Sequence, residues 1–173
     1  MKKILSFLLL AVILTVCFTS CSDDITYTDI TYRENGLEVV LPEGMRRSYT
    51  EGYDMYFSTP DMIFTATKID AELLEKNDIP LSSDVTSKEY TDFVIKSFDK
   101  DQLYFREDAS KNLYNFRYTY EVEDGQSELF YYVVVIGEPG NVWYIEMCCE
   151  QDNSSTYLSD FELWKKYIKT YSE

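Results

Sequence analysis

The chain has 173 residues, with 31 acidic and 16 basic side chains, no histidine and a formal net charge of −15. Phosphate backbones repel so acidic a protein, and we therefore expect no nucleic-acid partner. The missing histidine excludes Ser-His-Asp and Cys-His catalysis of the usual kind and removes the commonest zinc ligand. We expect neither a cofactor nor a metal site.

The first 20 residues have the pattern of a secretory signal. Two lysines precede an apolar run over 4–18, which is shorter than the roughly 20 residues of a spanning helix. Small residues then precede Cys21, and "FTSC" resembles the bacterial lipobox, in which the cysteine is lipidated and becomes the mature N-terminus. We expect a lipoprotein signal peptide over 1–20, a lipidated Cys21 with its tether over 21–29, and attachment to a bacterial membrane through that lipid. Ordinary secretion with a chance cysteine is the alternative.

The remainder, 30–173, is predicted to be a single domain that begins with strands. Alternation of apolar and polar residues, bounded by turn residues, is typical of half-buried strands. Four such segments occur, at 25–32, 37–41, 53–58 and 62–69. The last two are separated by Thr59-Pro60-Asp61 and are expected to pair as a hairpin.

A helix is predicted in the middle of the chain and another at its end. Thr86-x-x-Glu89 is a capping box, and the apolar spacing after it predicts a helix over 87–99. Strands are then expected at 103–107, 113–122, 128–136 and 142–150. The segment 154–173 is predicted to be helical, since its apolar residues recur at spacings of three and four: Tyr157, Phe161, Trp164, Ile168 and Tyr171.

Grouped strands joined by short turns predict an antiparallel sheet and an α+β fold. The segment 129–136 is apolar on both faces, so its strand should lie centrally with cover on both sides. We therefore predict an α/β/α sandwich, in which a mainly antiparallel central sheet of about six to eight strands carries one helix on each face.

Several stretches resemble the PsbP/DcrB-like superfamily, in particular small lipoproteins of gut bacteria that carry this domain. They are "NGLEVVLPEGM", "YFSTPDMIFTATK", "YNFRYTYEVEDGQSELFYYVVVI", "VWYIEMCCE" and "FELWKKYIKTYS", and they span most of residues 30–172. The resemblance implies a PsbP-like fold. It also implies a non-enzymatic role, because most members are extrinsic subunits that dock on membrane complexes or envelope proteins of uncertain role. It assigns no catalytic residue.

The stretch "MRRSYTEGYDMY" is the candidate binding loop. Arg46 and Arg47 form an adjacent basic pair, with Tyr49 and Tyr53 close behind. Arginine and tyrosine are favoured at the energetic centres of protein interfaces. The alternative is an ordinary loop whose arginines pair with some of the many acidic residues.

Two further features have both a structural and a functional interpretation. Cys148 and Cys149 fall in one predicted strand, so their side chains should point to opposite faces and pack as small buried residues. A vicinal disulfide or a redox role is the alternative. The 16 tyrosines suit strands and cores, although exposed tyrosines also stack on sugars or peptides.

The leading hypothesis is a lipid-anchored, extracytoplasmic, non-catalytic domain that binds or docks on another envelope protein. The first alternative is a lipoprotein that binds a small extracellular sugar or peptide in a pocket between sheet and helix. The second is a hydrolase that uses only carboxyl groups, which would need two of them facing each other with the pKa of one raised.

Overall fold

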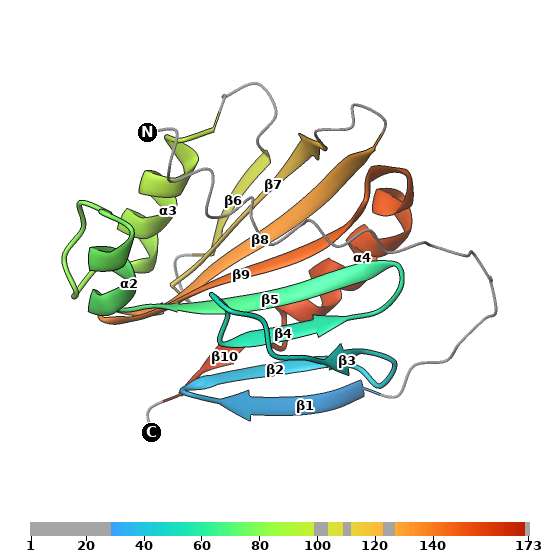
Figure 1. The fold of residues 1–173 in the computed structure, drawn as a ribbon, viewed down its shortest axis with the longest axis horizontal. Helices are drawn as coiled ribbons and strands as arrows, with labels where there is room; N and C mark the ends of the chain where they lie inside the picture. Colours follow the sequence, from blue (N-terminus) through green and yellow to red (C-terminus); the bar gives the residue numbers. More distant parts are fainter. Residues whose placement is uncertain (1–28, 99–103, 109–111, 123–126, 172–173) are drawn as a thin grey trace.

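The computed structural model describes residues 29–98, 104–108, 112–122 and 127–171, and the strands within them form two antiparallel sheets (Figure 1). The larger sheet has seven strands, in the spatial order β3 (Arg46–Arg47), β4 (Met55–Ser58), β5 (Met62–Ile69), β9 (Asn141–Glu150), β8 (Glu128–Glu138), β7 (Leu113–Glu121) and β6 (Tyr104–Asp108). The smaller sheet has the order β1 (Asp29–Glu34), β2 (Leu37–Pro42) and β10 (Lys169–Thr170).

The two faces of the larger sheet are covered differently. The helices α2 (Ala71–Lys76) and α3 (Ser87–Ile95) pack on one end of one face (Figure 1). The opposite face packs against the smaller sheet and against α4 (Ser154–Lys165), which follows the short 3-10 helix η3 (Gln151–Asn153). The predicted α/β/α sandwich is therefore confirmed, with the smaller sheet as an addition that the sequence pattern did not predict.

Most strands and the mid-chain helix lie where the sequence predicts them. The predicted hairpin of β4 and β5 is formed, with Phe57 opposite Phe64. The Thr86 hydroxyl accepts from the Glu89 backbone N–H, and the Glu89 carboxylate accepts from the Thr86 backbone N–H, so the capping box begins α3 as expected. The Ser87 hydroxyl donates to the Gly137 carbonyl at 2.7 Å, which fixes the start of α3 against β8.

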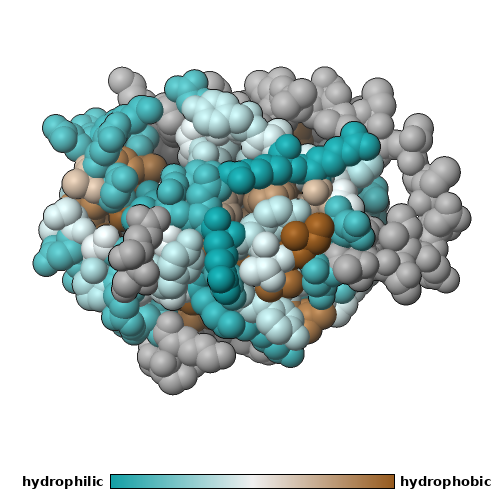
Figure 2. Space-filling view, turned by 90° about the horizontal axis from the view of Figure 1, so that it is seen from below, coloured by the Kyte–Doolittle hydropathy of each residue, from teal (hydrophilic) through white to brown (hydrophobic). Residues whose placement is uncertain are grey.

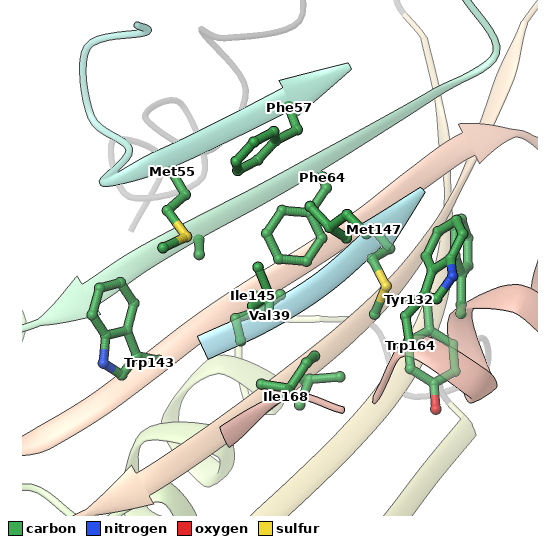
Figure 3. Packing of buried hydrophobic residues seen from close by; sticks show 14 of the residues in the cluster. Val39, Met55, Phe57, Phe64, Tyr132, Trp143, Ile145, Met147, Trp164 and Ile168 are labelled. Carbon is green, nitrogen blue, oxygen red and sulfur yellow. The ribbon is translucent and has the colours of Figure 1, made fainter. Parts of the chain in front are cut away.

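The main core fills the space between the larger sheet, the smaller sheet and α4 (Figure 3). Alternate residues of β2 point into it, so that Leu37, Val39 and Leu41 are fully buried. The second core lies under α2 and α3 and includes Tyr90 and Val94 of α3. Strand β8 is buried continuously from Tyr131 to Gly137, because both cores pack on it, and its predicted central position is confirmed.

The predicted C-terminal helix is too long. Helix α4 ends at Lys165, and Lys169–Thr170 form the edge strand β10, with Lys169 opposite Glu38 of β2. The Tyr171 backbone N–H continues this pairing by donating to the Gly36 carbonyl at 2.9 Å. Ile168 lies between the end of α4 and β10 and is buried in the main core. Its spacing of four residues from Trp164 therefore matched a helical pattern, although the chain is not helical there.

The outer surface on the side of β1 carries only small, separate hydrophobic areas (Figure 2). Within the described ranges, the large hydrophobic side chains that are exposed are Tyr49, Leu163 and Tyr167. The helices of the described part are too short or too polar to cross a bilayer.

Candidate functional site

The structure divides the predicted binding loop between two places. Arg46 and Arg47 form the short edge strand β3 rather than a loop, and they pair with Ser58 and Phe57 of β4. The residues that follow cross the edge of the sheet. Tyr49 projects outward there, whereas Tyr53 contacts a cluster on the other face.

Arg47 connects the two sheets. Its guanidinium donates to the carboxylate of Glu34 on β1, and it lies over the ring of Phe57, 5.9 Å from the centroid. Arg47 is thus paired with an acidic residue of the same chain, as expected from the alternative in which the arginines only pair with acidic residues. Arg46 is exposed, and Tyr49 is 92% exposed, so these two residues form the part of the predicted loop that faces solvent. We call Arg46, Arg47 and Tyr49 the edge corner.

Four tyrosines lie close to Glu146 or to its neighbour Cys148 on the face that also carries α2 and α3. We call them, together with Glu146, the tyrosine face; they are Tyr53, Tyr56, Tyr118 and Tyr131. The rings of Tyr118 and Tyr131 stack with their centroids 4.7 Å apart, and those of Tyr53 and Tyr56 are 6.0 Å apart. These residues come from β7, β8, β4 and the segment before β4, so only the assembled sheet brings them together.

Glu146 lies in the middle of β9 and is 6% exposed. Its Oε1 accepts from the Tyr144 hydroxyl at 2.9 Å and from the Tyr118 hydroxyl at 3.2 Å. Burial raises the pKa of this carboxyl, and the two hydroxyl donors oppose the rise without cancelling it. In turn, burial and the nearby Glu146 raise the pKa of Tyr53 and Tyr131.

Sequence reasoning missed Glu146, although one signal was present. It is the only charged residue between Asn141 and Cys149, in a strand that is otherwise apolar or aromatic. Carboxyl groups are almost never fully buried unless they are paired. A lone acid inside a predicted central strand therefore indicates hydrogen-bonding partners, but the pattern does not show that those partners are tyrosines of other strands.

The two adjacent cysteines lie on opposite faces of β9, and both are free thiols. Cys149 is part of the main core, whereas the Cys148 thiol hydrogen-bonds the hydroxyl of Tyr131 on the tyrosine face. Burial raises the pKa of both thiols, that of Cys149 to about 12. The prediction of two buried cysteines that do not bond to each other is confirmed.

The alternative of a carboxyl-based hydrolase depends on two carboxyl groups that face each other. The groups that shift the pKa of Glu146 are its own burial and two tyrosine hydroxyls, and none of them is a second carboxyl. Such a hydrolase needs a pair of carboxyl groups placed on either side of the bond that breaks. Across the described residues, no group of three His, Cys, Asp or Glu side chains is arranged to hold a metal ion.

Removal of the charge on Glu146 should change how stability depends on pH. The pKa of Glu146 is higher in the folded chain than in the unfolded chain, so folding favours the protonated acid. The stability that comes from this protonated acid is fully present below about pH 4, and it is lost as the pH rises through the pKa of the folded chain. Each unit by which the folded-state pKa exceeds the unfolded-state pKa corresponds to about 1.4 kcal/mol of this stability. Glu146→Gln keeps the acceptor oxygen and cannot ionise, so we expect it to become more stable than the wild type as pH rises.

Urea unfolding of both proteins between about pH 4 and pH 9 measures this difference. The difference between the two curves matters, because Glu38 and Glu89 have lowered pKa values, and the stability that they give both proteins is lost as the pH falls below about 4.5. Glu128→Gln removes an exposed charge from neighbouring β8 and serves as the control. A constant difference between wild type and Glu146→Gln at every pH would contradict the expectation.

Comparison with solved structures identifies the fold. Cyanobacterial PsbP (CyanoP) from Synechocystis sp. PCC 6803 matches with a TM-score of 0.52 and 14% identity, over 88% of this chain and 98% of that one. The chain has the PsbP-like fold. The sequence resemblance is thereby confirmed at the level of the fold, and no protein-family model or curated protein matches the chain.

Two other solved structures also match this PsbP-like chain. A protein from Bacteroides thetaiotaomicron VPI-5482 has a TM-score of 0.49 and 10% identity, over 80% of this chain and 46% of its own length. LpqN of Mycobacterium tuberculosis, which is involved in cell envelope biogenesis, has a TM-score of 0.48 and 11% identity, over 86% of this chain and 94% of its own length.

Proposed function

We propose that this PsbP-like chain is a non-catalytic, extracytoplasmic domain that is held to a bacterial membrane by lipid on Cys21 and docks on another envelope protein. The "FTSC" sequence supports the anchor, and the non-enzymatic character of the resembling superfamily supports the docking role. Residues 1–28 lie outside the described structure, so support for the anchor comes from sequence alone.

The observation that carries the docking proposal is the exposure of the edge corner. Tyr49 is 92% exposed, and exposed Arg46 lies on the edge strand just before it. Tyrosine and arginine are enriched among the residues that dominate binding energy, since each combines a large contact area with hydrogen bonding. The hydrophobic areas on the β1 side are small and separate, which favours a polar and aromatic contact over a wide apolar one (Figure 2).

The length of the tether restricts where the partner lies. Asp29 pairs with Pro42, and the Met45 backbone N–H donates to the Pro42 carbonyl at 3.0 Å, so β3 starts close to the point where the tether enters β1. The eight residue steps from Cys21 to Asp29 span at most about 30 Å when fully extended. The edge corner would therefore lie near the bilayer, and its partner is a protein in or on the same membrane.

The anchor is tested by metabolic labelling with a clickable fatty acid. We expect wild type to incorporate the label and to sediment with membranes, and Cys21→Ser to do neither. Cys17→Ser, which changes the other cysteine of the predicted signal, should behave as wild type and is the matched control. Label in Cys21→Ser, or a wild type without label, would overturn the anchor.

Docking is tested by a photoreactive amino acid at position 49 in intact cells, followed by denaturing purification. We expect one envelope protein to be cross-linked reproducibly. This cross-link should disappear when the photoreactive residue at position 49 is combined with Cys21→Ser. The same substitution at Tyr167, which is 45% exposed beyond the end of α4, is the matched control and should give no such adduct. Equal cross-linking from both positions, or none from position 49, would overturn docking through the edge corner.

A further inference from the structure

Strand β1 is the longest edge strand of the two described sheets. It has six residues and pairs only with β2, whereas the edge strands β3 and β10 have two residues each and β6 has five. Every second residue of an edge strand directs its backbone N–H and C=O away from the sheet. Among the described residues, the backbone of β1 forms no hydrogen bond with the backbone of any segment other than β2. Strand β1 lies at the lower border of the fold in Figure 1, where a further strand could pair with it.

A row of charges crosses the outer face of the smaller sheet and ends at β1. Lys169 of β10 lies opposite Glu38 of β2, and Glu38 lies opposite Arg33 of β1. The Glu38 carboxylate is 2.5 Å from Arg33 Nε and 3.6 Å from Lys169 Nζ. Opposite charges that face each other across strands stabilise antiparallel pairing. Because the row runs positive, negative, positive, the side chain that would extend it beyond Arg33 is a negative one.

A second copy of β1 supplies that negative side chain in one register. Antiparallel pairing keeps outer residues opposite outer residues only when the register changes by an even number of residues. With Thr31 opposite Thr31 of the second copy, Arg33 faces Asp29 and Ile30 faces Tyr32, and symmetry repeats both contacts. With Tyr32 opposite Tyr32 instead, Arg33 would face Thr31, and the charge match would be lost.

We propose that two copies of this chain associate through antiparallel pairing of their β1 strands, with a two-fold axis at Thr31. The two smaller sheets then join into one continuous sheet, and the charge row passes from Arg33 of one copy to Asp29 of the other. The occupant of the edge is a second copy because β1 is complementary to itself in both charge and apolar pattern. The pairing does not use Arg46 or Tyr49, so it goes beyond the docking function, and each of the two can fail alone.

Disulfide trapping tests the register in the full chain, purified in a nonionic detergent. In the proposed dimer the two copies of residue 31 have Cα atoms about 4.5–5.5 Å apart, a separation that a disulfide can span. On mild oxidation we expect Thr31→Cys to give at least about tenfold more covalent dimer than Glu43→Cys. Glu43 is exposed just after β2 and would lie more than about 14 Å from its copy, so it reports random collision. Equal yields from the two variants would overturn the proposal.

Both variants also carry Cys17→Ser and Cys21→Ser. These changes remove the other cysteines that lie outside the described fold, and Cys148 and Cys149 are buried. The substitution at Cys21 also makes the result independent of the proposed lipid. Failure of strand pairing is therefore distinguishable from failure of the membrane anchor.

Charge variants of the Thr31→Cys protein test the row itself. Asp29→Arg places an arginine opposite Arg33, and Arg33→Glu places a glutamate opposite Asp29, so each variant alone should give at least about threefold less covalent dimer. A mixture of the two variants restores opposite charges at both sites. Its mixed dimer, identified by tags of different mass, should form as well as the Thr31→Cys dimer, which also shows that both variants are folded. No loss in either variant alone, or no recovery in the mixture, would overturn the register.

Discussion

Gly137→Ala is expected to lower the free energy of unfolding by more than about 4 kcal/mol or to prevent folding. Gly137 has a φ of +139°, which residues with a side chain rarely adopt, and an added Cβ would lie 2.0 Å from the Asn141 carbonyl oxygen. That oxygen belongs to the backbone of the β8–β9 hairpin and cannot move away as a flexible side chain would. The same glycine also accepts the Ser87 hydrogen bond that fixes α3.

Gly52→Ala is the matched control for this substitution. Gly52 also has a positive φ, +93°, but an added Cβ would meet nothing within 4 Å. Its cost should therefore be backbone strain alone, about 1 kcal/mol. Urea unfolding followed by far-ultraviolet circular dichroism measures both variants, with protease resistance as the readout if Gly137→Ala does not fold. Equal losses in the two variants would contradict the steric explanation.

Trp143→Ala should cost about 3–5 kcal/mol, the range for deletion of a large buried aromatic side chain. Trp143 is fully buried, and it lies in the main core with Met55 and Ile145 (Figure 3). It occupies β9 between Lys68 of β5 and Ile136 of β8, at a place where the sheet cannot collapse to fill a cavity.

Trp143→Phe should cost clearly less, because it removes volume without stranding a hydrogen-bond partner. The Trp143 Nε1 is buried and donates to no acceptor in the described part of the chain. Loss of a buried donor that has no partner removes a penalty rather than a bond. Urea unfolding at neutral pH compares the two variants. A Trp143→Phe protein as unstable as Trp143→Ala would show that the indole N–H contributes to stability in another way.

Local patterns predicted most of the elements, and long-range pairing accounts for what they missed. The capping box located α3, and period-two alternation located β5 and β7, because those signals depend on neighbours in the chain. The smaller sheet was not predicted, since β10 has two residues and exists only through pairing with β2. The helix prediction for 168–171 failed for the same reason.

The candidate site shows the same division. The sequence correctly placed Cys148 and Cys149 on opposite faces, because strand geometry alone decides it. It grouped Tyr53 with Arg46 and Tyr49, which are neighbours along the chain. The structure instead places Tyr53 with Glu146, a residue 93 positions later whose approach depends on the pairing of β4, β5 and β9.

The position of the two free cysteines in β9 makes them a pair of built-in probes of local opening. Cys148 is exposed to reagent only when the tyrosines around it separate, and Cys149 only when the main core opens. Alkylation under native conditions, resolved by mass spectrometry in single-cysteine variants, would measure a separate opening free energy for each layer. Because Tyr53 and Tyr56 beside Cys148 are only half-buried, whereas Cys149 lies in the main core, Cys148 should be modified first.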